Sequence, residues 1–240
     1  VRVHSGYSLY NVGFAAGIIC TFYLSVAKIF GIEINTQLLW NTTYRTTAII
    51  FIIIVSLFFI VIGLLEKKMN VFTDMKKIVR HSGRLVTDFY ILYDGSIYFN
   101  MGILGILSLL VLIFMKIDIN GPTIGAIFTV MAFGAFGKHV LNVTPIIIGA
   151  ILASVLGISD TRSASNSLAI LFCTTLAPIS GQFGWGWGVI AGFLHLSLVS
   201  NIGFLHGGLN LYNNGFSGGF VAFMLVPFIA ALRRSEDDAA

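Results

Sequence analysis

Two stretches of the chain, one near each end, repeat the same polar residues and glycines at the same spacing. They read HSGYSLYNVGFAAG over residues 4–17 and HGGLNLYNNGFSGG over residues 206–219. Each stretch sets an imidazole, a phenol and at least one carboxamide beside glycines, in a chain that is 57% hydrophobic. These side chains form hydrogen bonds without a fixed charge. Such groups suit the binding of a small polar solute, because they replace the water that the solute sheds.

The two stretches are copies of one internal repeat. Aligned from their histidines, eight of the fourteen positions are identical. Apolar helices share Leu and Phe by chance, but they do not readily share His, Tyr, Asn and three Gly at fixed offsets. The identical pairs are His4/His206, Gly6/Gly208, Leu9/Leu211, Tyr10/Tyr212, Asn11/Asn213, Gly13/Gly215, Phe14/Phe216 and Gly17/Gly219.

We expect the repeated glycines to break membrane helices and the polar residues beside them to bind the solute. Irregular backbone survives inside a bilayer only where it is buried in protein or lines a wet cavity. The alternative is that Asn merely bonds a neighbouring helix, at about 0.6–2 kcal/mol, and that Gly merely permits close packing. For His206 the alternatives are a proton carrier and a capping or packing residue. The predicted substrate-binding residues are Tyr10, Asn11, Gln182, His206, Tyr212, Asn213 and Asn214, and the predicted helix-break residues are Gly13, Gly17, Gly207, Gly208, Gly215 and Gly219.

Other chemistries lack the residues that they need. No GxSxG or HExxH motif occurs, and Cys20 and Cys173 lie in apolar runs without metal-ligand spacing. Carboxylates are absent from the expected core spans, with Asp94 at an interface and Asp160 in a loop. A proton-coupled pump usually needs such carboxylates. We therefore predict no enzyme, catalytic residue, metal or cofactor. We also expect no nucleic-acid partner, because the basic residues behind the net charge of +4 sit in loops beside apolar spans.

The composition indicates that these residues lie in a lipid bilayer. Only 10% of the residues are charged and the mean hydropathy is +0.92, whereas a soluble domain carries roughly 25% charged residues. We predict an all-α, polytopic integral membrane protein with about seven to eight membrane segments, including broken or re-entrant helices. The predicted segments are Leu9–Phe30, Ala48–Leu65, Tyr98–Met115, Pro122–Gly137, Val140–Ile158, Ala164–Ile179, Trp185–Val199 and Phe216–Leu232, and the irregular ones are Pro122–Gly137, Ala164–Ile179 and the region Asn201–Gly219.

The basic residues predict an orientation. The long polar connection over residues 66–97 contains six Lys and Arg and apolar residues at helical spacing, which predicts an amphipathic surface helix on the cytoplasmic side. Counting spans from there places the turn at Lys138 on the same side. It also places the C-terminus there, after Arg233 and Arg234. The first copy of the repeat then leads into an outward helix and the second into an inward one, which makes an inverted internal repeat.

Inverted repeats around a polar midplane site are the architecture of transporters and channels. We expect a transporter or channel for a small polar, uncharged solute. One alternative is a membrane scaffold or assembly subunit, and another is an ion-coupled transporter whose acidic residues lie in a missing half. The chain opens inside the repeat. We therefore expect residues 1–30 to end a first, mostly missing repeat, residues 31–65 to give the first complete span of the second, and residues 98–240 to complete it after the connection. The expected partners are the lipid bilayer, this missing N-terminal half and the solute, and a homo-oligomer is left open.

Four stretches carry a resemblance to a known family. They are YDGSIYFNMGILG, GKHVLNVTPIIIGAIL, TTLAPISGQFGWGWGVIAGFLH and LHGGLNLYNNGFSGGFVA. Together they resemble an uncharacterised bacterial family of polytopic membrane proteins, known only as a domain of unknown function. The resemblance covers most of the chain and implies a multi-pass protein of the bacterial inner membrane, without supplying an activity.

A shorter resemblance is to urea transporters. Their repeated phrases pair Asn with small residues at a helix break, as YNVGFAAG and YNNGFSGG do here. Urea transporters also have two inverted halves around a central pore. This resemblance implies a pore for a small neutral solute and leaves the identity of the solute open.

Overall fold

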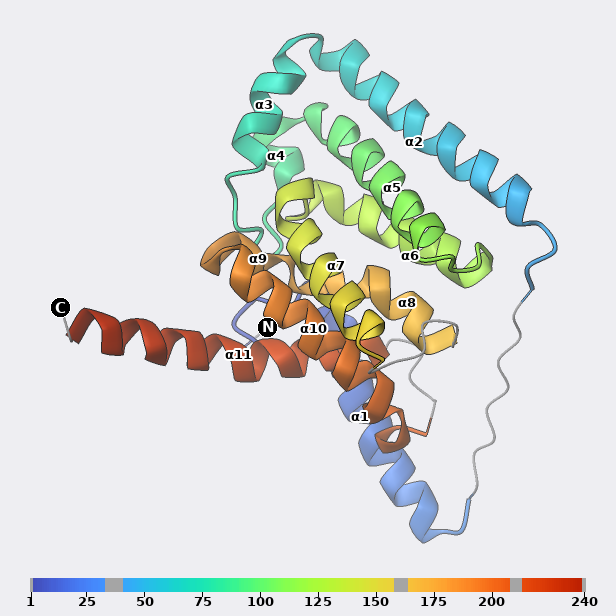
Figure 1. Ribbon diagram of the computed structural model, residues 1–240, viewed down its shortest axis with the longest axis vertical. Helices are drawn as coiled ribbons and strands as arrows, with labels where there is room; N and C mark the ends of the chain where they lie inside the picture. Colours follow the sequence, from blue (N-terminus) through green and yellow to red (C-terminus); the bar gives the residue numbers. More distant parts are fainter. Residues whose placement is uncertain (1, 33–40, 158–163, 208–212, 239–240) are drawn as a thin grey trace.

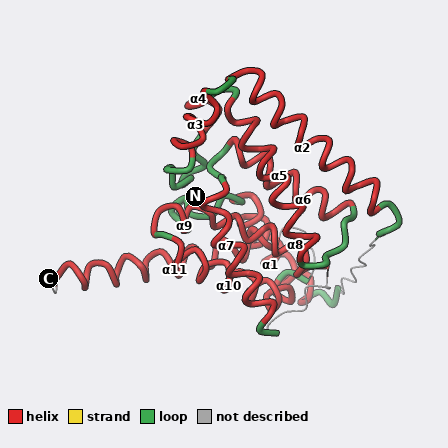
Figure 2. The backbone as a smooth tube through the Cα atoms, turned by 45° about the horizontal axis from the view of Figure 1, so that its top comes forward, coloured by secondary structure: helices red, strands yellow, loops and turns green. Residues whose placement is uncertain are grey.

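The computed structural model describes residues 2–32, 41–157, 164–207 and 213–238. Every named element in these ranges is a helix (Figure 2). Five of the described helices are long and apolar enough to cross a membrane, so the prediction of an all-α polytopic membrane protein is confirmed. They are α1 (Asn11–Ile29), α2 (Arg45–Lys67), α5 (Ser96–Phe114), α10 (Trp185–Ile202) and α11 (Asn213–Asp238).

Shorter helices complete the bundle. Two of them, α6 and α7, are apolar but below the length of a full span, and three 3₁₀ segments interrupt or end helices. The shorter elements are α3 (Asn70–Ile78), α4 (Phe89–Tyr93), α6 (Gly121–Ala132), η1 (Phe133–Ala135), α7 (Val140–Val155), α8 (Ala164–Phe172), η2 (Cys173–Leu176), α9 (Ala177–Phe183) and η3 (Gly203–Leu205).

Glycines let the long helices approach one another closely. Helices α2 and α5 lie side by side in both views (Figures 1 and 2), and a Cβ on Gly63 would lie 2.6 Å from the backbone nitrogen of Phe99. Helices α7 and α10 touch in the same way, since a Cβ on Gly149 would lie 1.9 Å from the carbonyl oxygen of Val189. Small residues have this role in membrane bundles, where van der Waals packing holds helices together.

The segment predicted as one broken helix is interrupted in the structure. Helix α8 ends at Phe172, the 3₁₀ turn η2 follows, and α9 starts at Ala177. Pro178 explains the place of the break, because proline has no N–H and its ring clashes with the carbonyl four residues earlier. That carbonyl belongs to Thr174, inside η2.

The polar connection over residues 66–97 forms two short helices rather than the single amphipathic helix expected. Helix α3 ends before a loop that contains Gly83 at φ +78°, and α4 starts after Asp88, whose carboxylate accepts a hydrogen bond from Ile91 N. Only a residue without a side chain fits at Gly83, because a Cβ there would lie 2.0 Å from the carbonyl oxygen of Gly137. The loop therefore docks onto the turn between α6 and α7.

The turn at Lys138, which the span count places on the cytoplasmic side, lies inside the protein. Lys138 has no exposed surface. Two buried carboxamides hold its backbone inside: Asn100 donates hydrogen bonds to the carbonyls of Gly134 and Lys138, and Asn142 donates one to the carbonyl of Gly137. Buried carbonyl groups need hydrogen-bond partners. These two side chains provide the partners and so allow the turn to be buried.

Candidate functional site

Both copies of the repeat fold in the same way locally. In each, the histidine Nε2 lies 3.0 Å from the side-chain oxygen of the asparagine seven residues later, His4 to Asn11 and His206 to Asn213. Each asparagine is the first residue of a helix, α1 or α11. Each histidine ring also meets, edge to face at 86°, the phenylalanine three residues beyond that asparagine. The repeated sequence therefore forms the same set of contacts at the start of both helices.

The two copies also contact each other reciprocally. A Cβ on Gly17 would lie 2.4 Å from the Phe216 ring, and a Cβ on Gly219 would lie 2.1 Å from the Phe14 ring. The two phenylalanine rings stack with centroids 6.2 Å apart. Each copy thus provides the glycine that receives the phenylalanine of the other. Helices α1 and α11 begin side by side near the centre of the molecule and then diverge (Figure 1).

This packing gives four glycines a role different from the predicted helix break. Gly13 and Gly17 lie inside the continuous helix α1, and Gly215 and Gly219 lie inside α11. A Cβ on Gly215 would lie 2.8 Å from the Cα of Gly13, so these glycines let the two backbones touch. In the first copy the irregular backbone precedes Asn11 instead, over residues 2–10.

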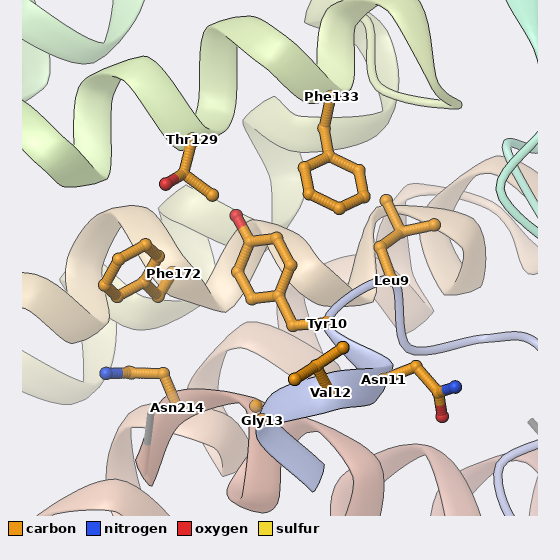
Figure 3. Close-up of a pocket in the computed structure, with 10 residues that line it drawn as sticks. Leu9, Tyr10, Asn11, Val12, Gly13, Thr129, Phe133, Phe172 and Asn214 are labelled. Atoms are coloured by element: carbon orange, nitrogen blue, oxygen red, sulfur yellow. The ribbon is translucent and has the colours of Figure 1, made fainter. Parts of the chain in front are cut away.

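A cavity of about 360 Å³ opens where α1 and α11 begin, beside α6, η1 and α8 (Figure 3). Most of its wall is apolar, and the polar side chains come from Tyr10, Asn11, Thr129 and Asn214. Figure 3 shows the Tyr10 ring in the middle of the group, with its hydroxyl on the side of Thr129 and Phe133, and the Asn11 amide turned away from that ring. The lining residues are Leu9, Tyr10, Asn11, Val12, Gly13, Thr129, Phe133, Phe172, Asn214 and Gly215.

Asn214 places a buried carboxamide beside the cavity. Its side chain is almost fully buried, with 4% of the residue exposed. Its backbone carbonyl lies 3.0 Å from His195 Nε2, but its side-chain oxygen has no hydrogen-bond partner within the described residues. A buried polar atom without a partner is costly, at about 1–3 kcal/mol.

Lys138 lies directly behind the cavity wall. Its Nζ donates hydrogen bonds to the Tyr10 hydroxyl and, at 2.7 Å, to Thr174 Oγ1. The same nitrogen lies 4.4 Å from the centroid of the Tyr10 ring and 5.2 Å from that of Phe133. No carboxylate forms an ion pair with Lys138 in the part of the chain that the structure describes. A fully buried ammonium group is therefore held by two neutral hydroxyls and two aromatic rings.

The break between α8 and α9 holds Tyr10 in place. Thr175 accepts a hydrogen bond from Leu9 N at its carbonyl and one from Tyr10 N at its Oγ1, both at 2.9 Å. Its hydroxyl also lies 3.2 Å from Ser8 Oγ. Thr174 binds the Lys138 ammonium, and Thr175 binds the backbone beside Tyr10. Two consecutive threonines of η2 thus position both sides of the cavity wall.

A model of a protein family of unknown function, DUF1576, matches residues 1–29 and 67–231. The chain belongs to the DUF1576 family. No curated protein and no solved structure matches it. Every residue that lines the cavity falls in the matched ranges of DUF1576, as do Lys138 and the two threonines. Most of helix α2 falls outside them.

The structure of this DUF1576 protein brings only some of the predicted site residues together. Tyr10, Asn11 and Asn214 line the cavity. Asn213 instead holds α10 and His206, because its amide donates to the carbonyl of Val199 at 3.2 Å and its side-chain oxygen accepts from the His206 ring.

The remaining predicted residues lie away from the cavity. Gln182 is exposed in the last turn of α9 and does not line the cavity. Gly207 has a left-handed backbone at φ +56°. Gly208 and Tyr212 lie outside the described residues.

Sequence reasoning missed Lys138, Thr174 and Thr175 as site residues of the DUF1576 fold. Lys138 was assigned to the orientation of the chain, because a lysine between two apolar segments usually marks a cytoplasmic turn. One signal was available: Lys138 is the only Lys or Arg between Pro122 and Ile158. An isolated ionisable residue at membrane depth is itself a mark of function.

Proposed function

We propose that this protein is a membrane transporter or channel for a small polar solute that binds in the cavity beside Tyr10 and Asn214. The observation that carries the proposal is the meeting of the two repeat copies at that cavity, where α1 and α11 both begin. Helices that begin in the interior of a membrane protein line the substrate sites of transporters. The polar residues Tyr10, Asn11, Thr129 and Asn214 in the wall of the cavity support a polar solute.

We also propose that the two copies are the matching parts of an inverted repeat. In Figure 1 the chain alternates in direction from α1 to α2, α5, α6, α7, the interrupted α8–α9 segment and α10, and α11 then leaves the bundle at a steep angle to α1. If each of these crosses once, α1 and α11 run in opposite senses. The basic connection over residues 66–97 and the end of α11 after Arg233 then lie on one side, which the charge distribution assigns to the cytoplasm.

The test is solute flux in proteoliposomes that contain the full chain. We expect at least one small polar solute, with urea, glycerol and small organic anions as the probes, to equilibrate faster than in empty liposomes, as followed by light scattering after rapid mixing. Asn214→Ala is expected to lower the flux of that solute at least fivefold, because it removes the buried amide of the cavity.

The matched control is Asn201→Ala. Asn201 is exposed on α10 and its amide bonds only the carbonyl of Ser197 on its own helix, so its loss should leave the flux within twofold of wild type. Equal flux in Asn214→Ala and wild type would place the solute elsewhere. A flux no faster than that of empty liposomes for neutral and charged small solutes alike would reject transport.

A further inference from the structure

We propose that the transported solute is a small organic monoanion whose negative group binds Lys138 when the Tyr10 ring turns aside. This inference rests on the proposed transport function and specifies its substrate class. It replaces the uncharged solute expected from the sequence, which was based on the assumption that no charged group lies in the core.

A positive charge on Lys138 would need a partner, since burial without an opposite charge favours the neutral amine. Removing an ammonium group from water costs several kcal/mol unless an opposite charge compensates. The hydroxyls of Tyr10 and Thr174 orient the group but carry no opposite charge. The ion pairs within the described residues, Lys67 with Asp94 and Lys77 with Asp74, use their carboxylates elsewhere. An anionic solute would supply the opposite charge from the cavity.

The position of Tyr10 makes it a gate between solute and ammonium. Its ring lines the cavity on one face and its hydroxyl holds Lys138 on the other. The ring meets Phe133 and Phe172 edge to face, with centroids 5.1 and 5.6 Å apart. Rotation of this one side chain away from Lys138 would open the ammonium to the cavity. A carboxylate or sulfonate could then take the place of the phenol oxygen.

The rest of the cavity fits the body of such an anion. Leu9, Val12, Phe133 and Phe172 form an apolar wall, which suits a hydrocarbon or aromatic group better than a fully hydrated inorganic ion. The volume of about 360 Å³ holds on the order of ten non-hydrogen atoms, at about 30 Å³ for each water-sized group. The amino-terminal ends of α1 and α11 point their positive dipole ends at the same space, which favours an anion further.

The experiment compares matched charged and neutral probes on the full chain. Benzoate and benzamide share shape and size, and benzenesulfonate keeps its charge at every accessible pH and crosses lipid poorly. We expect benzoate and benzenesulfonate, but not benzamide, to raise the unfolding temperature of the purified protein in detergent, because a ligand stabilises the folded state that binds it. We expect labelled benzenesulfonate to enter proteoliposomes at least tenfold faster than empty liposomes.

Two variants of Lys138 test whether this residue binds the negative group of the solute. Lys138→Met keeps the length of the side chain without its charge and should lower benzenesulfonate entry at least tenfold, whereas Lys138→Arg should keep a measurable part of it. A wild-type measurement stands beside them in case Lys138→Met does not fold. An inside-positive potential, set with potassium and valinomycin, should speed benzenesulfonate entry and leave benzamide entry unchanged.

The outcomes separate this inference from the proposed function. If wild-type protein passes benzamide or urea but neither binds nor passes the two anions, the anion assignment is overturned and transport stands. If Lys138→Met folds and passes benzenesulfonate at the wild-type rate, Lys138 is not the partner. If none of the probes enters faster than in empty liposomes, both proposals fail.

Discussion

Gly192→Ala is expected to destabilise the protein strongly, because the added methyl group meets backbone atoms of a neighbouring helix. The added Cβ would lie 1.9 Å from the carbonyl oxygen of Ile146, 2.7 Å from its carbonyl carbon and 3.0 Å from its Cα. These are backbone atoms of α7, so no side-chain rotation can relieve the contact. Overpacking a well-packed core costs typically 1–3 kcal/mol. A clash with backbone should reach the upper end, about 3 kcal/mol, in the free energy of unfolding.

Gly186→Ala is the matched control for this prediction. Gly186 lies in the same helix α10, but within the described residues no atom of another helix lies within 4 Å of a Cβ added there. Since Ala is a better helix former than Gly by about 1 kcal/mol, this change should leave the stability unchanged or raise it. The measurement is the unfolding temperature in detergent of the three purified proteins. Equal unfolding temperatures for both variants would mean that α7 and α10 do not touch at Gly192.

Thr175→Val is expected to have the second largest effect, on function as well as stability. The change keeps the shape of the side chain but removes the oxygen that accepts a hydrogen bond from Tyr10 N and contacts Ser8 Oγ. A buried N–H without a partner costs about 1–3 kcal/mol. Because Tyr10 forms the wall between the cavity and Lys138, its displacement should lower solute flux in proteoliposomes at least tenfold.

Thr144→Val controls for the loss of a hydroxyl. The Thr144 hydroxyl donates only to the carbonyl of Val140 on its own helix, at 2.7 Å, so its removal leaves no group of another segment without a partner. We expect this variant to keep wild-type flux. If Thr144→Val and Thr175→Val lowered flux equally, the hydrogen bonds of Thr175 to residues 8–10 would not be what positions the wall.

The helices themselves were predictable because their signal is local. The segment predicted as Ala48–Leu65 forms α2 at Arg45–Lys67, and the segment predicted as Tyr98–Met115 forms α5 at Ser96–Phe114. Long runs of apolar residues have few other stable states in a bilayer, where every backbone group must be bonded within the segment. The break in Ala164–Ile179 has a local signal too, because Pro178 cannot donate a hydrogen bond to the carbonyl of Thr174. That signal does not decide the outcome alone, since Pro145 and Pro227 lie inside the continuous helices α7 and α11.

The roles of the repeated residues were predictable only in part. Sequence pointed to the cavity through Tyr10, Asn11 and Asn214, which line it. The repeat marks Tyr10 and Asn11, whereas Asn214 aligns with Val12 and is not shared by the two copies. It assigned Gly17 and Gly219 to helix breaks, whereas they receive the rings of Phe216 and Phe14. A glycine has the same local signal whether it breaks a helix or admits a neighbour, and the neighbour comes from the other end of the chain.

The amino-acid sequence by itself showed that this protein lies in a bilayer, where its long helices run and which phrase is repeated. These features could be read from the sequence because composition and periodicity depend on the residues of one segment alone. Only the tertiary structure decided that Lys138 faces Tyr10 and Thr174 rather than water. A lysine in a turn has the same local sequence signal in both cases. Its burial depends on Asn100 and Asn142, which bond the carbonyls of the turn and so let a charged residue leave the membrane surface for the wall of the cavity.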